Sequence, residues 1–366
     1  MANIMDYLKW RGDLKFDISP VNEIDSLILT RISYLPFQDI EFENRETIEE
    51  ISLKMVEIPE EKFIWKEDKV LIEALAKTDR FKDLFVSDYR EKIDLLEEKQ
   101  FGAVTIWLPN NEVYISFRGT DMTFVGWKED FNMSFMTNIP SQLEAVSYLE
   151  MISKKYSNQI RMGGHSKGGN IAVYAAIFCN DEIKSRIIEV INADGPGFDK
   201  EVIISENYEK VINKIKTYIP QSSIIGRLLE HEEEYIVIES KEKGIMQHDV
   251  FSWEVEGTKL IRIGEFTKDS QIVNEIVRDW LISTTPEQRK NFINIIYEIV
   301  SNTNAKSVNE FIRQIIKNVR PVLSNYKNID ENERKEIESM LKLLMLSTRS
   351  VLRKEFSIKK KKDKNN

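Results

Sequence analysis

Cysteine is almost absent from this sequence, because Cys179 is the only one among 366 residues. A single cysteine cannot form an internal disulfide, which excludes a small secreted domain held together by disulfides and favours a reducing compartment. We therefore expect a cytoplasmic protein. Cys179 follows a run of small and apolar residues, so we interpret it as a buried hydrophobic side chain rather than a reactive thiol.

Long apolar runs and an excess of basic charge are also lacking. No apolar run is long enough to cross a bilayer, and the N-terminus shows neither the basic nor the apolar segment of a signal peptide. The formal net charge is −9, whereas a nucleic-acid-binding protein needs a basic face, so we expect no nucleic-acid partner. Only the lysine-rich end, 359–364, leaves peripheral membrane contact open, and a short lysine run alone binds anionic lipid weakly.

The hydrophobic patterns divide the chain into four regions. Residues 1–80 are predicted to form a helical region that packs on the core. Residues 81–265 alternate strands with helices, which predicts a doubly wound α/β sheet. Residues 266–356 are predicted to be helical, and residues 357–366 to be a basic, disordered tail. Three capping patterns mark helix starts in the third region, at Thr285, Ser307 and Asp330.

The most informative stretch is Gly164-His165-Ser166-Lys167-Gly168. It follows the apolar run 160–162 and precedes a small-residue helical segment, 171–177, so the pattern G-x-S-x-G stands in a strand–turn–helix context. In that context a serine lies on a sharp elbow and becomes a candidate nucleophile, and glycines are needed because a Cβ there would collide with the strand or the helix. An ordinary glycine-rich turn is the alternative interpretation.

A serine hydroxyl needs a neighbouring base, normally a histidine oriented by a carboxylate. The sequence has only three histidines. His165 adjoins the serine and points away from it, and His231 stands in a highly charged run that indicates a solvated side chain. His248 follows the last predicted strand and is therefore the candidate base. Asp194, after an earlier strand, is the first choice for the acid, although an aspartate before Gly-Pro is also typical of a turn.

A tetrahedral intermediate also needs donors for its negative oxygen. The backbone N–H of Lys167, at the start of the elbow helix, is one candidate. A second is expected from the loop that contains Thr120, with the Thr120 hydroxyl helping. The Lys167 ammonium could pair with Asp121 or favour an anionic substrate, and the sequence does not choose between these.

Several of these segments resemble those of known lipases. Phe117-Arg118-Gly119-Thr120 followed by Trp127 and Asp130, and then the elbow, resembles the class 3 lipase family of α/β-hydrolases. A closer resemblance, to a bacterial family of uncharacterised lipase-like proteins, rests on the segments 6–13, 163–170, 194–198 and 247–249. It covers most of residues 1–260. It implies an α/β-hydrolase fold for residues 81–265, with Ser166 as nucleophile, His248 as base, and Thr120 with Lys167 at the oxyanion hole.

The resemblance also implies a lid, which in class 3 lipases follows the arginine–glycine motif. Here that segment is 122–127, and its Phe124, Val125 and Trp127 could cover an acyl pocket or simply pack in the core. One departure concerns the acid, which class 3 lipases usually carry after the next strand. This chain offers only Ser222 and Ser223 there, so the Asp194 position resembles that of pancreatic-type lipases instead.

We therefore expect a serine hydrolase that cleaves a carboxylic ester, with an acyl lipid or another small ester as substrate, through Ser166, His248 and Asp194. No cofactor and no metal ion are expected. Two alternatives stay open. One is a catalytically weak or inactive interaction protein on a hydrolase scaffold, and the other is a thioesterase or peptidase that uses the same triad.

Overall fold

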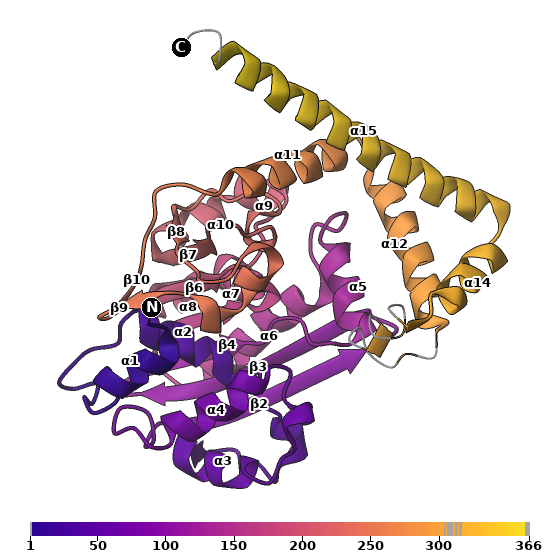
Figure 1. Ribbon diagram of the computed structural model, residues 1–366. Helices are drawn as coiled ribbons and strands as arrows, with labels where there is room; N and C mark the ends of the chain where they lie inside the picture. The colour runs from indigo at the N-terminus through magenta and orange to yellow at the C-terminus, as the bar shows by residue number, and fades with distance from the viewer. Residues whose placement is uncertain (1, 304, 306–309, 312–313, 315–316, 363–366) are drawn as a thin grey trace.

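The computed structural model describes residues 2–303, 305, 310–311, 314 and 317–362 (Figure 1). An eight-stranded sheet forms its centre, with the strands side by side in the order β1 to β8. The first four are antiparallel neighbours, and β4 to β8 run parallel. The strands are β1 (Glu46–Thr47), β2 (Phe85–Asp94), β3 (Lys99–Leu108), β4 (Glu112–Phe117), β5 (Gln159–His165), β6 (Ile187–Ala193), β7 (Ile215–Pro220) and β8 (Tyr235–Ile238). The predicted α/β fold, of α/β-hydrolase type, is confirmed.

The sheet buries both of its faces, which explains why its strands are rich in valine and isoleucine. Side chains alternate along each strand, so Tyr114 of β4 points into one hydrophobic cluster while Val113 and Ile115 point into the other. One face is covered by α1 (Ile4–Arg11), α2 (Glu23–Ile32), α3 (Ile48–Met55) and α4 (Lys66–Leu75). The other is covered by α6 (Pro140–Lys155), α7 (Lys167–Phe178) and α8 (Asp181–Arg186).

The β3–β4 hairpin turns at residues 109–111, as predicted. Asn110 and Asn111 both have positive φ angles, 61° and 60°, which asparagine tolerates better than most residues because its short polar side chain can bond locally. The hairpin places β4 beside β5, so the loop after β4 meets the elbow after β5 at the same edge of the sheet.

The N-terminal helices are built into the core. Nine of the ten residues of α2 are buried. Two buried ion pairs anchor the region, Arg80–Asp25 at 2.5 Å and Arg31–Asp68 at 2.6 Å. The helical character predicted for residues 1–80 is found, and the short strand β1 at the sheet edge was not anticipated because two residues carry no periodic pattern.

The C-terminal helices are α11 (Lys268–Ile282), α12 (Pro286–Ser301), α14 (Arg320–Asn328) and α15 (Glu331–Lys362). Thr285 forms the predicted capping box at the start of α12, and Asp330 precedes α15, whereas Ser307 lies outside the described residues. These helices share a small cluster of their own, separate from the two sheet clusters: Ile295, Ile299, Ile329 and Ile337.

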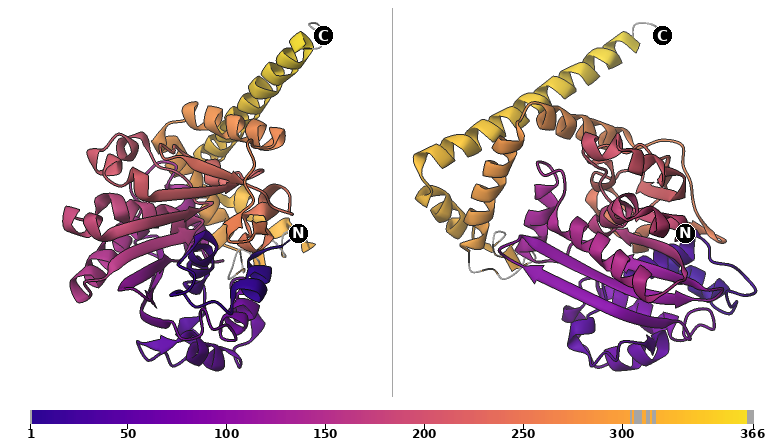
Figure 2. Two further views of the ribbon diagram at one scale, coloured as in Figure 1. Left: turned by 90° about the vertical axis from the view of Figure 1, so that its left-hand side faces the viewer. Right: turned by 180° about the vertical axis from the view of Figure 1, so that it is seen from behind.

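The disorder expected of residues 357–366 stays a prediction, and the structure describes part of this segment. Residues 357–362 continue α15, and only 363–366 lie outside the described residues. Lysine is a good helix former, and positive charge is favourable at a helix C-terminus, so the lysine run can extend the helix. The C-terminal end of α15 projects beyond the rest of the molecule (Figures 1 and 2). Among the described residues, no helix is long and apolar enough to cross a membrane.

The remaining short elements connect these layers. They include α5 (Phe124–Asn132), α9 (Lys200–Ile203), α10 (Glu206–Glu209), the 3-10 turns η5 (Gly244–His248) and η6 (Val250–Ser252), and the ribbon of β9 (Val255–Glu256) and β10 (Lys259–Leu260).

Candidate active site

Ser166 lies on the elbow that the sequence predicts. Strand β5 ends at His165, α7 begins at Lys167, and Ser166 between them has φ 59° and ψ −134°. Such a conformation costs a non-glycine residue of the order of 1–3 kcal/mol and persists only where the surroundings impose it. A Cβ on Gly164 would come within 2.3 Å of the Gly168 backbone, and one on Gly168 within 2.2 Å of the Phe117 carbonyl oxygen. The two glycines therefore permit the close approach of strand, helix and neighbouring loop.

Asp194 and His248 meet beside this elbow. The Asp194 Oδ2 lies 2.7 Å from Nδ1 of His248, and Asp194 is fully buried. Its other oxygen accepts a hydrogen bond of 2.6 Å from Ser223 Oγ. Ser223 stands where class 3 lipases usually carry the acid, so here that position supports the carboxylate instead of supplying it. Asp249, next to His248 in the chain, accepts a 3.0 Å hydrogen bond from Phe251 N–H instead.

The contact between serine and histidine is not formed. Ser166 Oγ makes no hydrogen bond with any described residue, whereas Ser166 N–H donates to the Ala193 carbonyl at 2.9 Å, next to Asp194. Catalytic hydrogen bonds are often long or poorly aligned before substrate binds. The structure thus brings the acid and the histidine together, and leaves the serine hydroxyl without a partner in the part of the chain it describes.

The backbone N–H groups of the two predicted oxyanion donors, Thr120 and Lys167, are available to a substrate. Neither Thr120 N–H nor Lys167 N–H donates to any described residue. The loop and the elbow are in close contact, since a Cβ on Gly119 would lie 3.2 Å from Ser166 Cβ. The Thr120 hydroxyl, expected to help, donates instead to the two oxygens of Asp130 at 2.6 and 2.7 Å. Burial raises the pKa of this Asp130 carboxyl to about 6.

The Lys167 side chain does neither of the things expected of it. It is buried, and its Nζ lies 2.8 Å from Glu129 Oε2 and 2.7 Å from Gln100 Oε1. Glu129 also accepts bonds from the N–H groups of Gln100 and Ser141. The ammonium is therefore fully paired beneath the elbow, and it reaches neither Asp121 nor the substrate side.

Tyr34, which the sequence did not indicate, connects the loop to the elbow. Its hydroxyl accepts a 3.1 Å hydrogen bond from Gly119 N–H and lies 3.1 Å from the His165 carbonyl and 3.2 Å from His165 Nδ1. These contacts join residues 85 and 131 positions apart. No local pattern predicts such a contact, and it appears only once the chain is folded.

His165 in turn holds the backbone of His248. Its Nε2 lies 2.6 Å from the His248 carbonyl oxygen. Burial, with the nearby His248 and Arg31, keeps the pKa of His165 well below its usual range, so the ring is neutral and carries one proton. A carbonyl can only accept, which places that proton on Nε2 and leaves Nδ1 to accept from Tyr34 or from Arg31, 3.4 Å away.

The buried pair of Arg31 and Asp68 supports this arrangement. Two nearly parallel hydrogen bonds of 2.9 and 2.6 Å join the guanidinium to the carboxylate. The Arg31 guanidinium also lies 4.0 Å from the centre of the Tyr34 ring. Burial raises the pKa of Asp68 to about 6 even beside the arginine, because neither side chain of the pair is accessible to water.

The expectation for His231 is wrong. Its side chain is 6% exposed and lies 2.9 Å from Glu233, rather than being solvated. Burial alone would raise the pKa of Glu233, but the hydrogen bond and charge of His231, with hydroxyl groups of Tyr208 and Thr217, lower it to about 2. The acidic run around His231 is therefore not wholly exposed, because the Glu233 side chain points inward and bonds to His231, Tyr208 and Thr217.

The predicted lid segment is divided between buried and exposed side chains. Phe124 begins α5 and packs against the Phe311 ring, with centroids 6.1 Å apart. Val125 is buried, whereas Trp127 is 40% exposed. A role in covering a substrate stays a prediction.

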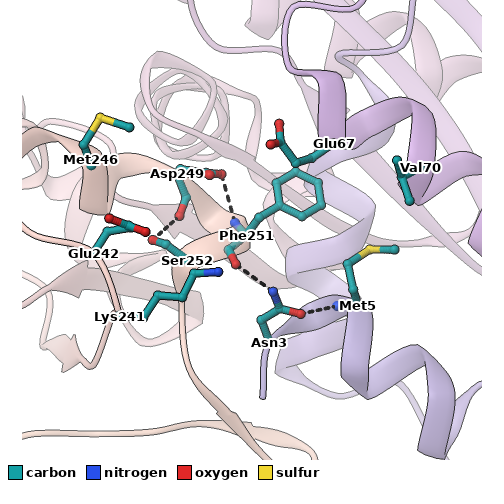
Figure 3. A pocket seen from close by; sticks show the side chains of 10 residues that line it. All are labelled: Asn3, Met5, Glu67, Val70, Lys241, Glu242, Met246, Asp249, Phe251 and Ser252. Carbon is teal, nitrogen blue, oxygen red and sulfur yellow. Dashed lines mark hydrogen bonds between the residues drawn. The ribbon is translucent and has the colours of Figure 1, made fainter. Parts of the chain in front are cut away.

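A cavity of about 400 Å³ lies beside the loop that carries His248 (Figure 3). The N-terminal segment, α4 and the 241–252 loop line it, and Asn3 Nδ2 donates to the Phe251 carbonyl at 2.9 Å across one side. Ser166, His248 and Asp194 do not line this cavity, so it offers no direct acyl site. Within the described part of the chain, no group of three or more His, Cys, Asp or Glu side chains is arranged to hold a metal ion.

Comparison with known proteins adds the family. Residues 75–298 match the Mbeg1-like family, which is lipase-like and related to class 3 lipases. No curated protein matches the chain. The match covers more than half of the sequence, including the elbow, Asp194 and His248. The chain therefore belongs to the Mbeg1-like family.

Proposed function

We propose that this protein is a serine hydrolase that cleaves a carboxylic ester through Ser166, His248 and Asp194. The observation that carries the proposal is the 2.7 Å contact between Asp194 Oδ2 and His248 Nδ1 next to a serine held at φ 59°. A lipase-like family is compatible with a hydrolase. A turn-forming aspartate would not need burial, a serine donor and a histidine partner together.

The proposed reaction begins with attack of Ser166 Oγ on the ester carbonyl. With the Nδ1 proton of His248 directed at Asp194, Nε2 is free to take the serine proton as the new C–O bond forms. The carbonyl oxygen becomes negative and is held by the N–H groups of Thr120 and Lys167, each worth about 3 kcal/mol of barrier in comparable sites. The histidine then gives its proton to the departing alcohol, leaving an acyl-serine.

A water molecule completes the cycle. His248 takes a proton from the water, whose oxygen attacks the acyl-serine carbonyl, and the proton returns to Ser166 as the acid leaves. Asp194 keeps the imidazole oriented in both halves and stabilises the imidazolium. We propose an acyl lipid as the substrate class, because Phe124, Val125 and Trp127 form an apolar segment directly after the oxyanion loop.

Hydrolysis of p-nitrophenyl esters of increasing chain length tests this proposal. Ser166→Ala should abolish turnover, and Asp194→Asn should lower kcat by about 10⁴-fold, because the asparagine favours the wrong histidine tautomer. Ser185→Ala, an exposed serine on α8, is the matched control and should keep full activity. Intact turnover in Asp194→Asn would place the acid elsewhere.

A second candidate is an interaction protein without turnover. The observation that favours it is the unpartnered hydroxyl of Ser166. A folded wild-type chain that hydrolyses no ester, thioester or peptide, and that reacts with no fluorophosphonate, would support it. Turnover of thioesters or peptides in preference to esters would keep the triad and change only the leaving group.

A further inference from the structure

Helix α15 carries apolar side chains on the side that packs on the body and also on the exposed side next to it, which we call the outer side. Its inner side packs on α11 and α12, with Ile337, Met340 and Val351 buried. Trp280 of α11 donates to the Met340 carbonyl at 3.3 Å, and Asn291 of α12 donates to Glu336 at 3.0 Å. The position of α15 on the body is therefore fixed from Glu336 to Val351.

The outer side carries a second apolar row. Leu341, Met345 and Leu352 are 46%, 54% and 38% exposed. Spacings of four and seven residues place them above one another along one side of a helix. Scattered exposed hydrophobic residues are ordinary, but a row on one side of a helix needs a partner surface.

Basic residues flank this row. Lys342 and Arg349, seven residues apart, follow the same line one step around the helix, and both are exposed. Neither forms an ion pair with a described residue. Between residues 342 and 362 the sequence has eight lysines and arginines and a single glutamate, although the whole chain carries a net charge of −9. Positive charge is thus concentrated on one helix of an acidic protein.

We propose that the outer side of α15 docks on an anionic membrane surface. A helix with an apolar row beside a basic row lies in the plane of the lipid headgroups, where the apolar side chains enter the acyl boundary and the cations meet lipid phosphates. The lysine run alone binds anionic lipid weakly, and the apolar row supplies the second attraction that stable binding requires. This docking is independent of the proposed triad, so either can fail without the other.

The way α15 projects from the body also supports docking on a membrane. Its C-terminal end extends past α11 and α12 (Figure 1), so a flat surface can reach that end of the helix without colliding with the body. The acidic remainder of the molecule is repelled by anionic lipid, which orients the protein with this helix toward the membrane.

Sedimentation of the full chain with vesicles tests the proposal. We expect binding to phosphatidylcholine vesicles that contain phosphatidylserine, little binding to phosphatidylcholine alone, and release by salt. The charge variant Lys342→Glu/Arg349→Glu and the apolar variant Leu341→Ser/Met345→Ser/Leu352→Ser should each weaken binding by at least about tenfold.

Matched controls make the same chemical changes elsewhere. Lys77→Glu and Leu53→Ser alter exposed residues near the opposite end of the molecule and should leave binding unchanged. The proposal is overturned if wild type does not bind phosphatidylserine vesicles, or if the controls weaken binding as much as the α15 variants. It is also overturned if wild type forms a dimer without lipid that the apolar variant loses, because the row would then bind a second copy of the chain.

Discussion

The helices that flank the sheet at the two ends of the chain are bound to it in opposite ways. At the N-terminal end, α2 lies buried against the sheet, and Arg31 and Tyr34 reach the elbow. At the C-terminal end, α14 has no buried residue, and α11 buries only Ser270. Both regions are helical and charged in sequence, so composition does not distinguish them. The difference lies in what each helix covers.

The part of the chain that matches the family is shorter than the part that builds the candidate site. The family match begins at residue 75 and ends at 298. The unmatched N-terminal segment nevertheless supplies Tyr34, which bonds to both the oxyanion loop and the elbow. We therefore expect changes in the N-terminal helices to damage folding and catalysis, and changes in the C-terminal helices to affect neither strongly.

The largest effect is expected from Asp68→Ala. The substitution leaves the Arg31 guanidinium buried without its carboxylate, and breaking a buried pair in this way costs about 3–5 kcal/mol. Urea unfolding measures the loss. Glu331→Ala, which removes an exposed ion pair with Lys335 on α15, is the C-terminal counterpart and should cause no measurable change. Equal losses of unfolding free energy in the two variants would contradict the difference between the N-terminal and C-terminal helices.

Tyr34→Phe should come next, and its effect should fall on catalysis. Loss of the hydroxyl leaves Gly119 N–H without an acceptor and frees the loop that carries Thr120. We expect the rate of fluorophosphonate labelling to fall about tenfold, equivalent to ~1.4 kcal/mol. Tyr326→Phe, which loses a hydroxyl bonded to Glu338, is the control in the C-terminal region. An unchanged rate in Tyr34→Phe would show that the loop does not need this tyrosine.

Burial of His165 should make the free energy of unfolding depend on pH. Its pKa is lowered well below the usual value in the folded state, so the unfolded chain binds a proton that the folded chain resists. Stability is therefore retained above about pH 6.5 and lost as the pH falls below it, by up to ~1.4 kcal/mol per pH unit. Between about pH 7 and pH 5, His165→Asn should lose less stability than wild type. Parallel losses in urea titrations of the two proteins would contradict this assignment.

The smallest effect is expected from removal of α15. A chain that ends at Asp330 loses one side of the small C-terminal cluster but no contact with the elbow. Its labelling rate should stay within about twofold of wild type, which is less than half a kcal/mol. A large drop would mean that the C-terminal helices support the site as the N-terminal ones do.

Local patterns explain what could be predicted from the sequence. The elbow at Ser166 was predictable because its glycines, strand and helix are adjacent in the chain. Asp194 and His248 were predictable as neighbours because residues that follow parallel strands meet at one edge of the sheet. That they meet at 2.7 Å needed the structure, and their catalytic role stays a prediction.

Long-range contacts explain the rest. Lys167 reaches Glu129 across 38 positions, and no spacing rule links a lysine after a serine to a glutamate on α5. The sequence predicted a solvated His231 because a run of acidic residues is usually exposed. In the structure Glu233 of that run turns into the core and pairs with His231. Tyr34 gave no signal at all, since its hydroxyl bonds to Gly119 and His165, which lie 85 and 131 positions away in the chain.

Mass spectrometry of the full chain after reaction with a fluorophosphonate tests the central claim most directly. The account predicts that the phosphonate adds to the peptide that contains Ser166, and that Ser166→Ala takes up none. A folded wild-type chain that stays unmodified, or that is modified at another residue while Ser166 remains free, would contradict it.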